Sequence, residues 1–348
     1  MNLFSRTLID WYAEHRRDLP WRNTSNPYLI WISEIILQQT RVVQGMDYYL
    51  RFVQRFPDIA SLASAEEDEV LKYWQGLGYY SRARNLHAAA RSMQHGFPST
   101  YAEVRALKGV GDYTAAAICS FAYGLPYAVV DGNVYRVLSR YWGIDLPIDA
   151  AAGKKHFSAL AQELLPSDQA AVYNQAIMDF GALQCTPQSP RCEECPLLES
   201  CAAVATGRVQ ELPVKQPKQK PVPRYFNYIY VRTGAYTYIN QRQGNDIWKN
   251  LYEFPLIETE MDLSESEFLS SPQFQSLISP GEEPFIRCVY PPVKHVLSHR
   301  IIYAHFYEVH LPVGSSSFSA YQRIPIDELS HYAVPRLVHQ FLENIEKF

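Results

Sequence analysis

The stretch LKGVGDYTAAA, residues 107–117, joins two helical patterns through a pair of glycines. Upstream, Thr100 and Glu103 have the spacing of a capping box, which marks the start of the first helix. Downstream, the residues from Asp112 onward suit the first turn of a second helix. The glycines permit a tight turn whose backbone N–H groups point outward. This order predicts a helix–hairpin–helix, a unit that can hold a DNA phosphate without a side-chain charge.

The residues of this turn that we expect at the phosphate are Lys108, Gly109, Val110 and Gly111. A Gly-x-Gly turn by itself is often only a helix cap, so the prediction depends on its surroundings. An apolar stretch, Val129 and Val130, leads to Asp131 at the start of a further helical pattern. A lone aspartate there would by default be an N-cap, worth about 1 kcal/mol. The order along the chain, which continues into four cysteines, gives each of these features more weight.

The four cysteines lie close together as C-x6-C-x2-C-x5-C, at Cys185, Cys192, Cys195 and Cys201. Such short gaps are awkward for two disulfides but natural for four ligands around one compact centre. Four cysteines without a histidine suit either zinc or an iron–sulfur cluster. A small disulfide or structural zinc knot is the plainer alternative.

Composition limits the class of protein. The chain has 348 residues, which suggests two domains, and its net charge of −4 argues against a protein that coats nucleic acid non-specifically. There is no run of about 18 apolar residues and no signal-peptide pattern, so we expect an intracellular protein without membrane spans. Cysteines in that compartment stay reduced, which favours a metal centre over disulfides.

The first 212 residues are expected to be nearly all helical. Asn26 and Pro27 form a helix start signal, and Ser64–Glu67 fits a second capping box. Helical patterns also cover 84–94, 113–122, 132–141, 154–164 and 168–181.

The second half changes character after a proline-rich stretch. Residues 213–224 carry four prolines and four basic residues with no acid, so we expect an extended linker, either solvated or in contact with DNA. Beyond it, FNYIYVR, AYTYIN and IYAHFYEVHL alternate and are rich in Tyr, Ile and Val, as strands are. An acidic, serine-rich segment at 258–283 is a helix or a loop, and the tail from Val334 is a final helix.

Taken together, the motifs of residues 1–212 resemble the endonuclease III superfamily of DNA base-excision glycosylases. That superfamily binds a 4Fe–4S cluster with this cysteine spacing, so the resemblance implies that the four cysteines are cluster ligands. Four segments are similar to one branch, the MutY family of adenine DNA glycosylases: LPWR at 19–22, WISEIILQQT at 31–40, GLGYYSRARN at 76–85 and DGNV at 131–134.

Glu34 is the discriminating residue of that branch. It lies in an otherwise apolar helical stretch, where an unpaired carboxylate is costly. Burial would raise its pKa, which a general acid needs. The resemblance also implies that Gln39 and Tyr79 wedge into the duplex at the lesion, although core packing is an alternative for Tyr79. Arg22 and Arg82 belong to the same motifs and are expected at DNA.

Tyr113 stands four residues after Gly109, where bifunctional relatives carry a nucleophilic lysine. A phenol cannot form a Schiff base, so hydrolysis without an efficient strand-cleaving step is expected. The resemblance implies that Glu34 protonates adenine N7 and that ionised Asp131, oriented by Asn133, stabilises or traps the oxocarbenium-like sugar. The adenine must first be flipped out of the stack. Tyr113 is expected near Asp131 or the departing sugar, or else only as a packing tyrosine.

Residues 225–348 resemble the C-terminal domain of the same family, which has a Nudix-like α/β fold. WKNLYEFP at 248–255 matches its W-x-x-L-x-x-F-P segment, and the glycine and clustered glutamates of a Nudix pyrophosphatase are absent from the sequence. In the family a Phe-Ser-His loop touches 8-oxoguanine. Leu297, Ser298 and His299 occupy this position, so aromatic stacking is lost while two hydrogen-bonding groups remain.

The sequence thus predicts a two-domain protein with an all-α helix–hairpin–helix glycosylase domain (1–212), a linker (213–224) and a Nudix-like recognition domain (225–348). Its expected activity is hydrolytic removal of adenine opposite 8-oxoguanine or G in duplex DNA, by a monomer. The alternatives are a thymine or pyrimidine mismatch glycosylase of the same superfamily, and a cluster-containing DNA-damage binder without catalysis.

Overall fold

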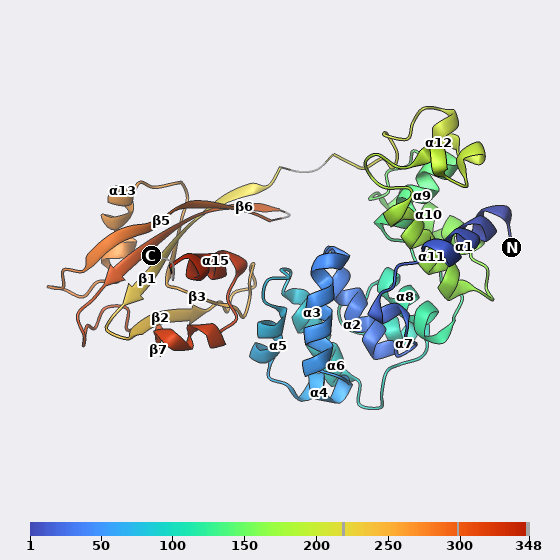
Figure 1. Cartoon of the computed structure of the whole chain (residues 1–348). Coiled ribbons are helices and arrows are strands. Elements are labelled where there is room, and N and C mark those ends of the chain that lie inside the picture. The colour runs from blue at the N-terminus through green and yellow to red at the C-terminus, as the bar shows by residue number, and fades with distance from the viewer. Residues whose placement is uncertain (218–219, 298, 346–348) are drawn as a thin grey trace. The chain divides into compact units, whose positions relative to one another are not determined.

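Apolar residues at helical spacing build most of the first half of the chain into short helices (Figure 1). The structure is a computed structural model that describes residues 1–217, 220–297 and 299–345. Contacts divide the chain into one unit of Met1–Ser64 with Asn85–Pro217, and a second unit of Ala65–Arg84 with Lys218–Phe348. No described helix has the length and apolarity needed to cross a membrane.

The helices up to the cysteine loop are, in order, α1 Leu3–His15, α2 Pro27–Leu37, α3 Val42–Arg55, α4 Ile59–Ser64, α5 Glu67–Trp74, α6 Ser81–Ser92, α7 Tyr101–Ala106, α8 Asp112–Tyr123, α9 Gly132–Trp142, α10 Ala151–Leu164 and α11 Ala170–Leu183. Short 3-10 turns follow at Cys192–Glu194 and Leu198–Ser200, and α12 covers Ala202–Ala205.

Helix α2 lies in the middle of the first unit. Asn26 caps it by accepting from the backbone N–H of Tyr28, and Pro27 takes its first position, as the sequence predicts. Ile30, Trp31 and Ile32 are fully or almost fully buried, and α2 packs against α3 and α8. Because nearly the whole circumference of the helix is apolar and covered, a carboxylate on it is largely removed from bulk water.

The hairpin predicted from residues 107–117 joins α7 to α8. Thr100 caps α7 through the backbone N–H of Glu103. Gly109 has φ 81°, the left-handed conformation that favours glycine, and the Val110 side chain is buried beneath the turn. Gly111 has φ −94° and is the N-cap of α8. The turn is therefore fixed from below by Val110, while Lys108 and both glycines are exposed.

Two sheets form the second unit. The strands are β1 Val222–Arg232, β2 Tyr236–Gln241, β3 Tyr252–Glu253, β4 Leu256–Thr259, β5 Phe285–Val296, β6 Arg300–His310 and β7 Gln322–Pro325. One sheet has the order β4-β1-β6-β5, with β1 and β6 parallel, and the other has the order β3-β2-β7.

Successive residues of β6 point to opposite faces of the larger sheet, and each face receives a helix (Figure 1). Phe306 stacks on Phe341 of α15 (Arg336–Ile345) with ring centroids 4.3 Å apart. Tyr307 stacks at 4.4 Å on Phe268 of α13 (Glu265–Leu269), beside α14 (Pro272–Gln275). This covered α/β sheet matches the α/β fold predicted for the second domain.

Two local expectations were wrong. Ser64 does not cap α5: it is the last residue of α4, and α5 begins at Glu67 with Glu66 as an N-cap that makes no side-chain bond. The expected linker also ends early, because β1 already starts at Val222. The division of the chain between Pro217 and Lys218 lies within that linker, but the membership of residues 65–84 in the second unit has no signal in the sequence.

Candidate active site and cluster loop

A cavity of about 550 Å³ opens in the first unit, and residues from widely separated parts of the sequence line it. α2 contributes Glu34, α8 contributes Tyr113, and the segment before α9 contributes Asp131. Arg22 and Asn133 also belong to the polar part of the lining. All four predicted catalytic residues, together with Arg22, therefore share one cavity.

Glu34 is 7% exposed, and its carboxylate accepts a hydrogen bond of 2.8 Å from the Tyr113 hydroxyl. The pKa of Glu34 is raised to about 7: burial is the largest cause and the nearby Asp131 charge adds to it, while the bond from Tyr113 and the charge of Arg22 oppose the rise. A carboxyl group with this pKa holds a proton at neutral pH for part of the time, which suits a general acid. Tyr113 is thus more than a packing residue, and burial holds the pKa of its phenol well above the usual range.

Asp131 has a different environment. It caps α9 by accepting from the backbone N–H groups of Asn133 at 2.9 Å and Val134 at 2.8 Å, and the Asn133 amide donates to its other oxygen at 2.8 Å. Burial raises the pKa of Asp131, and these three bonds oppose the rise because they stabilise the charged form. The cap and a role as an ionised catalytic group are therefore compatible, since the same donors serve both.

Arg22 belongs to a buried ion pair that the sequence alone did not reveal. Its guanidinium donates to both carboxylate oxygens of Asp179, one of them at 2.7 Å, and Arg17 donates to the same carboxylate at 2.9 Å. Asp179 is fully buried; burial raises its pKa, but the bonds and charges of Arg22 and Arg17 outweigh this and lower it. Arg22, expected at DNA, thus lies in the lining of the cavity.

Asp179 could have been found by the criterion that identified Glu34. It stands in the apolar helical stretch AIMDFGAL, where an unpaired carboxylate is just as costly. The identity of its partners, by contrast, depends on tertiary contacts across more than 150 residues of sequence.

Helix α9 links this cavity to the cysteine loop. Arg136 donates to Asn133 Oδ1 at 2.8 Å and, through its Nε, to the carbonyl of Cys185 at 2.7 Å. One turn later, Arg140 donates to the carbonyl of Thr186 at 2.7 Å and contacts Cys185 Sγ at 3.4 Å. Both arginines are buried, so the loop and the start of α9 are held as one piece.

The four cysteines are free thiols and belong to the loop that this helix holds. They are near enough to affect one another: burial raises the pKa of Cys195 to about 11, with smaller contributions from the other three thiols. In the described part of the chain no three Cys, His, Asp or Glu side chains are close enough to hold a single metal ion. Four thiols without a histidine are the donor set of a four-iron cluster, and these four residues would hold it.

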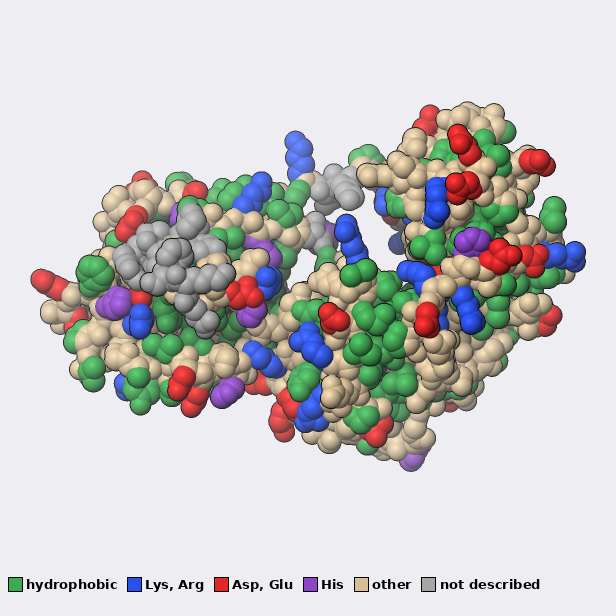
Figure 2. Space-filling view, in the orientation of Figure 1, with side chains coloured by type: hydrophobic (Ala, Val, Ile, Leu, Met, Phe, Trp, Pro, Cys, Tyr) green, Lys and Arg blue, Asp and Glu red, His purple; other side chains and the backbone are tan. Residues whose placement is uncertain are grey.

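The residues predicted to meet DNA lie mostly at the surface. Lys108, Gly109 and Gly111 are exposed, whereas the buried side chain of Val110 leaves only its backbone for a phosphate. Gln39 is exposed and has φ 59°. The side chains in Figure 2 show basic and acidic groups interspersed over the visible face, in keeping with the slightly negative net charge.

In the second unit Tyr79 is 49% exposed and the neighbouring Tyr80 only 4%, so Tyr79 is the tyrosine whose ring lies at the surface. Arg82, also expected at DNA, donates to the carbonyls of Leu77 at 3.2 Å and Gly78 at 3.3 Å, so its guanidinium also shapes the loop before it.

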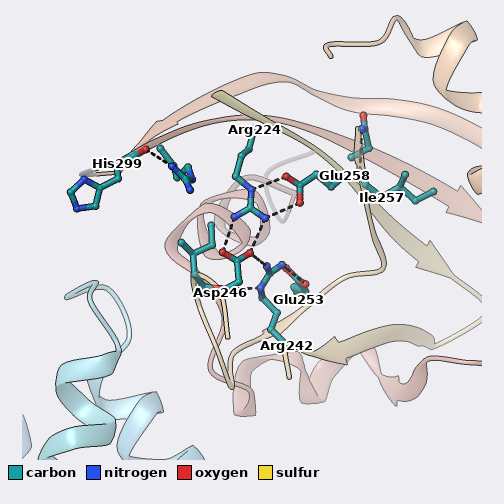
Figure 3. Close-up of polar contacts among 10 residues, drawn as sticks. Arg224, Arg242, Asp246, Glu253, Ile257, Glu258 and His299 are labelled. Atoms are coloured by element: carbon teal, nitrogen blue, oxygen red, sulfur yellow. Dashed lines mark hydrogen bonds and ion pairs between the residues drawn. The ribbon is translucent and has the colours of Figure 1, made fainter. Parts of the chain in front are cut away.

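The turn predicted to read the opposite base joins β5 to β6. The Leu297 N–H donates to the Arg300 carbonyl at 2.8 Å, and Leu297 packs against the apolar core. His299 is exposed, and Figure 3 shows its ring directed away from the ion-pair cluster of Arg224, Arg242 and their carboxylates. Ser298 lies outside the described residues.

Comparisons with known proteins agree with this arrangement. Family models match the base-excision repair proteins of the HhH-GPD superfamily over residues 32–166, the iron–sulfur binding domain of endonuclease III over 185–201, and the NUDIX domain over 227–344. An adenine DNA glycosylase of Buchnera aphidicola subsp. Acyrthosiphon pisum is 30% identical across 99% of this chain and 98% of its own length. One from Rattus norvegicus is 42% identical over 60% of this chain and 44% of its own.

Among solved structures, a thermostable thymine-DNA glycosylase is similar with a TM-score of 0.55 and 31% identity, covering 59% of this chain and 96% of its own. An endonuclease III–DNA complex, at 22% identity and a TM-score of 0.51, shares the fold of the same part of the chain. A further relative, an adenine DNA glycosylase of Buchnera aphidicola subsp. Baizongia pistaciae, is 36% identical over 75% of this chain and 76% of its own length.

Proposed function

The chain belongs to the adenine DNA glycosylases, base-excision repair enzymes that carry a 4Fe–4S cluster, and we propose that it removes adenine opposite 8-oxoguanine or G with Glu34 and Asp131 as catalytic residues. This family membership accords with the predicted fold class, activity and cofactor. The observation that carries the catalytic proposal is that Glu34 and Asp131 line one cavity. Their carboxylates differ in the number of hydrogen-bond donors around them.

Glu34 supplies the proton. Adenine is a poor leaving group until one of its ring nitrogens is protonated, and a buried carboxyl group with a pKa near 7 can donate to N7 at neutral pH. The Tyr113 hydroxyl keeps the Glu34 carboxyl in one orientation. As the C1′–N9 bond breaks, the electrons leave with the protonated base.

Asp131 meets the positive charge that this bond cleavage leaves on the sugar. Its carboxylate is held ionised by two backbone donors and Asn133, so it stabilises the oxocarbenium-like centre or bonds to it until water completes hydrolysis. Tyr113 offers no amine for a Schiff base, so the strand remains intact after base release.

The cluster's ligands in this proposal are Cys185, Cys192, Cys195 and Cys201. When bound, the cluster supplies a rigid centre for the loop, and no step of the hydrolysis needs its electrons. Arg136 and Arg140 tie that loop to the start of α9, and so to Asp131.

Specificity is proposed to come from the opposite base, because adenine is a normal component of DNA. 8-Oxoguanine differs from guanine by an N7–H donor and an O8 acceptor. His299, between β5 and β6, has a ring that can hydrogen-bond this edge, and Leu297 near it in the sequence packs against the core. By its chemistry the Ser298 hydroxyl can also hydrogen-bond this edge. Gln39 and Tyr79 are proposed as wedges, and the hairpin 108–111 as the phosphate site.

A panel of four duplexes tests this proposal: A opposite 8-oxoguanine, A opposite G, A opposite T, and T opposite G. We expect single-turnover adenine release that is fastest opposite 8-oxoguanine, with strand cleavage only after alkali. His299→Ala should narrow the difference between 8-oxoguanine and G, whereas His331→Ala, an exposed histidine elsewhere in the second unit, should not. Release of thymine opposite G would contradict this proposal and favour a thymine mismatch glycosylase instead.

A further inference from the structure

The loop that carries Tyr79 has an unusual backbone. Gly76 has φ 99°, Gly78 has φ 71° and Tyr79 itself has φ 46°, so three of four consecutive positions are left-handed. A tyrosine seldom adopts this conformation, which persists only where the surroundings fix it. Contacts with neighbouring residues must therefore hold residues 76–80 in this conformation.

The two helices that flank the loop, α5 and α6, hold part of it. The Trp74 indole N–H, at the end of α5, donates to the Gly78 carbonyl at 3.1 Å. From α6, Arg82 donates to the carbonyls of Leu77 and Gly78, and its guanidinium lies 5.6 Å from the centre of the Tyr79 ring. These bonds close the second half of the loop but leave its beginning at Gly76 unfixed by them.

Tyr80 supplies the remaining support. Its side chain is 4% exposed, and its hydroxyl accepts from the Gly76 N–H at 3.4 Å while donating to the Val334 carbonyl at 3.2 Å. Val334 lies just before α15 and is itself buried. One hydroxyl thus joins the first left-handed residue of the loop to the C-terminal part of the second unit.

Among the described residues, side chains of α5 and α6 make further hydrogen bonds with the rest of the second unit. They include Asn250 to Glu67 at 2.5 Å, Tyr252 to Asp68 at 3.2 Å, Lys72 to the Tyr332 carbonyl at 3.4 Å, and Arg84 to the Lys249 carbonyl at 2.7 Å. They attach the segment as a whole, whereas the Tyr80 hydroxyl also bonds the loop itself, at Gly76.

From these contacts we infer that the C-terminal part of the chain shapes the loop that presents Tyr79, and that Tyr80 is the positioning residue. The inference rests on the proposed function, in which Tyr79 enters the duplex at the lesion. It gives the C-terminal part a second contribution to recognition, separate from the turn at residues 297–299. Because the Tyr80 side chain is buried, its role in this inference is to position the loop and not to contact DNA.

Tyr80→Phe tests this with little change of volume, and Tyr252→Phe is the matched control. Both remove one tyrosine hydroxyl that ties residues 65–84 to the rest of the unit, but only the first acts on the loop. The probe is a duplex with 8-oxoguanine opposite 2′-fluoro-deoxyadenosine, which resists cleavage because fluorine destabilises positive charge at C1′. Since one hydrogen bond is worth about 1 kcal/mol, we expect about fivefold weaker binding for Tyr80→Phe and wild-type binding for Tyr252→Phe.

Three further measurements distinguish positioning by Tyr80 from general destabilisation of the protein. The two variants should melt within a few degrees of each other, and Tyr80→Phe at saturating enzyme should keep the wild-type single-turnover rate on adenine opposite 8-oxoguanine. In a Tyr79→Leu background, adding Tyr80→Phe should change binding no further, because the residue that it positions is gone.

Equal binding by Tyr80→Phe and Tyr252→Phe, together with a loss for Tyr79→Leu, would overturn the positioning role while the proposed function stands. Wild-type binding by Tyr79→Leu would contradict the proposed role of Tyr79 in the duplex, and with it the inference about Tyr80. Wild-type protein that fails to distinguish 8-oxoguanine from G would contradict the proposed specificity instead, and this is read from the separate duplex panel.

Discussion

At the residue scale, two carboxylates in one cavity differ in what surrounds them. Glu34 receives a single hydrogen bond, from Tyr113, inside an apolar helix, whereas Asp131 receives two backbone N–H groups and an amide. Burial favours the neutral form of both, but Asp131 has three hydrogen-bond donors that oppose it and Glu34 has one. This asymmetry is what assigns the acid to Glu34 and the anion to Asp131.

The asymmetry predicts the pH dependence of adenine release. Glu34 acts in its protonated form and has a pKa of about 7, so the single-turnover rate should fall as the pH rises through about 7. Asp131 acts in its ionised form, so the rate should also fall in acid, at a pH above the usual range for an aspartate because burial raises its pKa. A rate that rises steadily from pH 6 to pH 9 would contradict the assignment of the acid.

Tyr113→Phe should move the alkaline limb of that profile. The Tyr113 hydroxyl stabilises ionised Glu34 and lowers its pKa, so removing it should raise the pKa and shift the limb to higher pH. Tyr123→Phe, on the same helix but bonded to the Pro98 carbonyl, is the control and should leave the profile in place. A shift to lower pH would show that the hydroxyl does not favour the carboxylate.

At this scale the sequence predicts a functional residue where its polarity differs from that of its neighbours along the chain. Glu34 stands out because it is charged in an apolar helix. The partners of Arg22 are invisible in the sequence, since Asp179 meets it only after α11 packs beside α1. The sequence likewise cannot show which of Tyr79 and Tyr80 is buried, because that depends on Val334, more than 250 residues away.

At the scale of elements, the hairpin shows that its two glycines have unequal roles. A Cβ on Gly109 would lie 2.7 Å from Asn85 Cβ, at a backbone φ of 81°, whereas a Cβ on Gly111 would meet nothing within 4 Å. The motif predicts the turn, but only the three-dimensional contacts distinguish the glycine that the turn requires.

Gly109→Ala should therefore destabilise the protein by more than about 1 kcal/mol, because alanine is strained at positive φ and has no room here. It should also weaken duplex binding equally for damaged and undamaged DNA, since the hairpin is proposed to hold phosphate. Gly111→Ala should stay within about 0.5 kcal/mol of wild type. Thermal unfolding and duplex titration measure both effects, and equal behaviour of the two variants would refute the difference.

Helix α9 is the element that connects the cavity with the cysteine loop. Arg136→Ala would leave the carbonyls of Cys185 and Gly181 and the amide of Asn133 without their donor. We expect a loss of about 2–5 kcal/mol of stability, lower iron content and slower adenine release. Arg208→Ala removes an arginine from the exposed carboxylates of Asp145 and Glu211 and should change none of these. If Arg136→Ala keeps wild-type iron content and rate, the helix does not couple the two sites.

At the scale of the whole molecule, the boundary along the sequence differs from the boundary in space. The proline-rich stretch predicts a linker at residues 213–224, and contacts divide the chain between Pro217 and Lys218, yet residues 65–84 belong with the C-terminal unit. Removing everything after residue 224 would uncover Tyr80 and the helices that pack with that unit. Point variants in the full chain are therefore the sharper way to test recognition of the opposite base.

The most direct test of the central claim is the single-turnover rate of adenine release by Glu34→Gln from a duplex with adenine opposite 8-oxoguanine. Glutamine keeps the size of the side chain and can still accept from Tyr113, but it has no acidic proton to transfer to the base. The account predicts that release is abolished while binding to the uncleavable duplex stays near wild type. Release at a rate close to wild type would show that another group protonates the base, and would contradict the assignment of Glu34 as the acid.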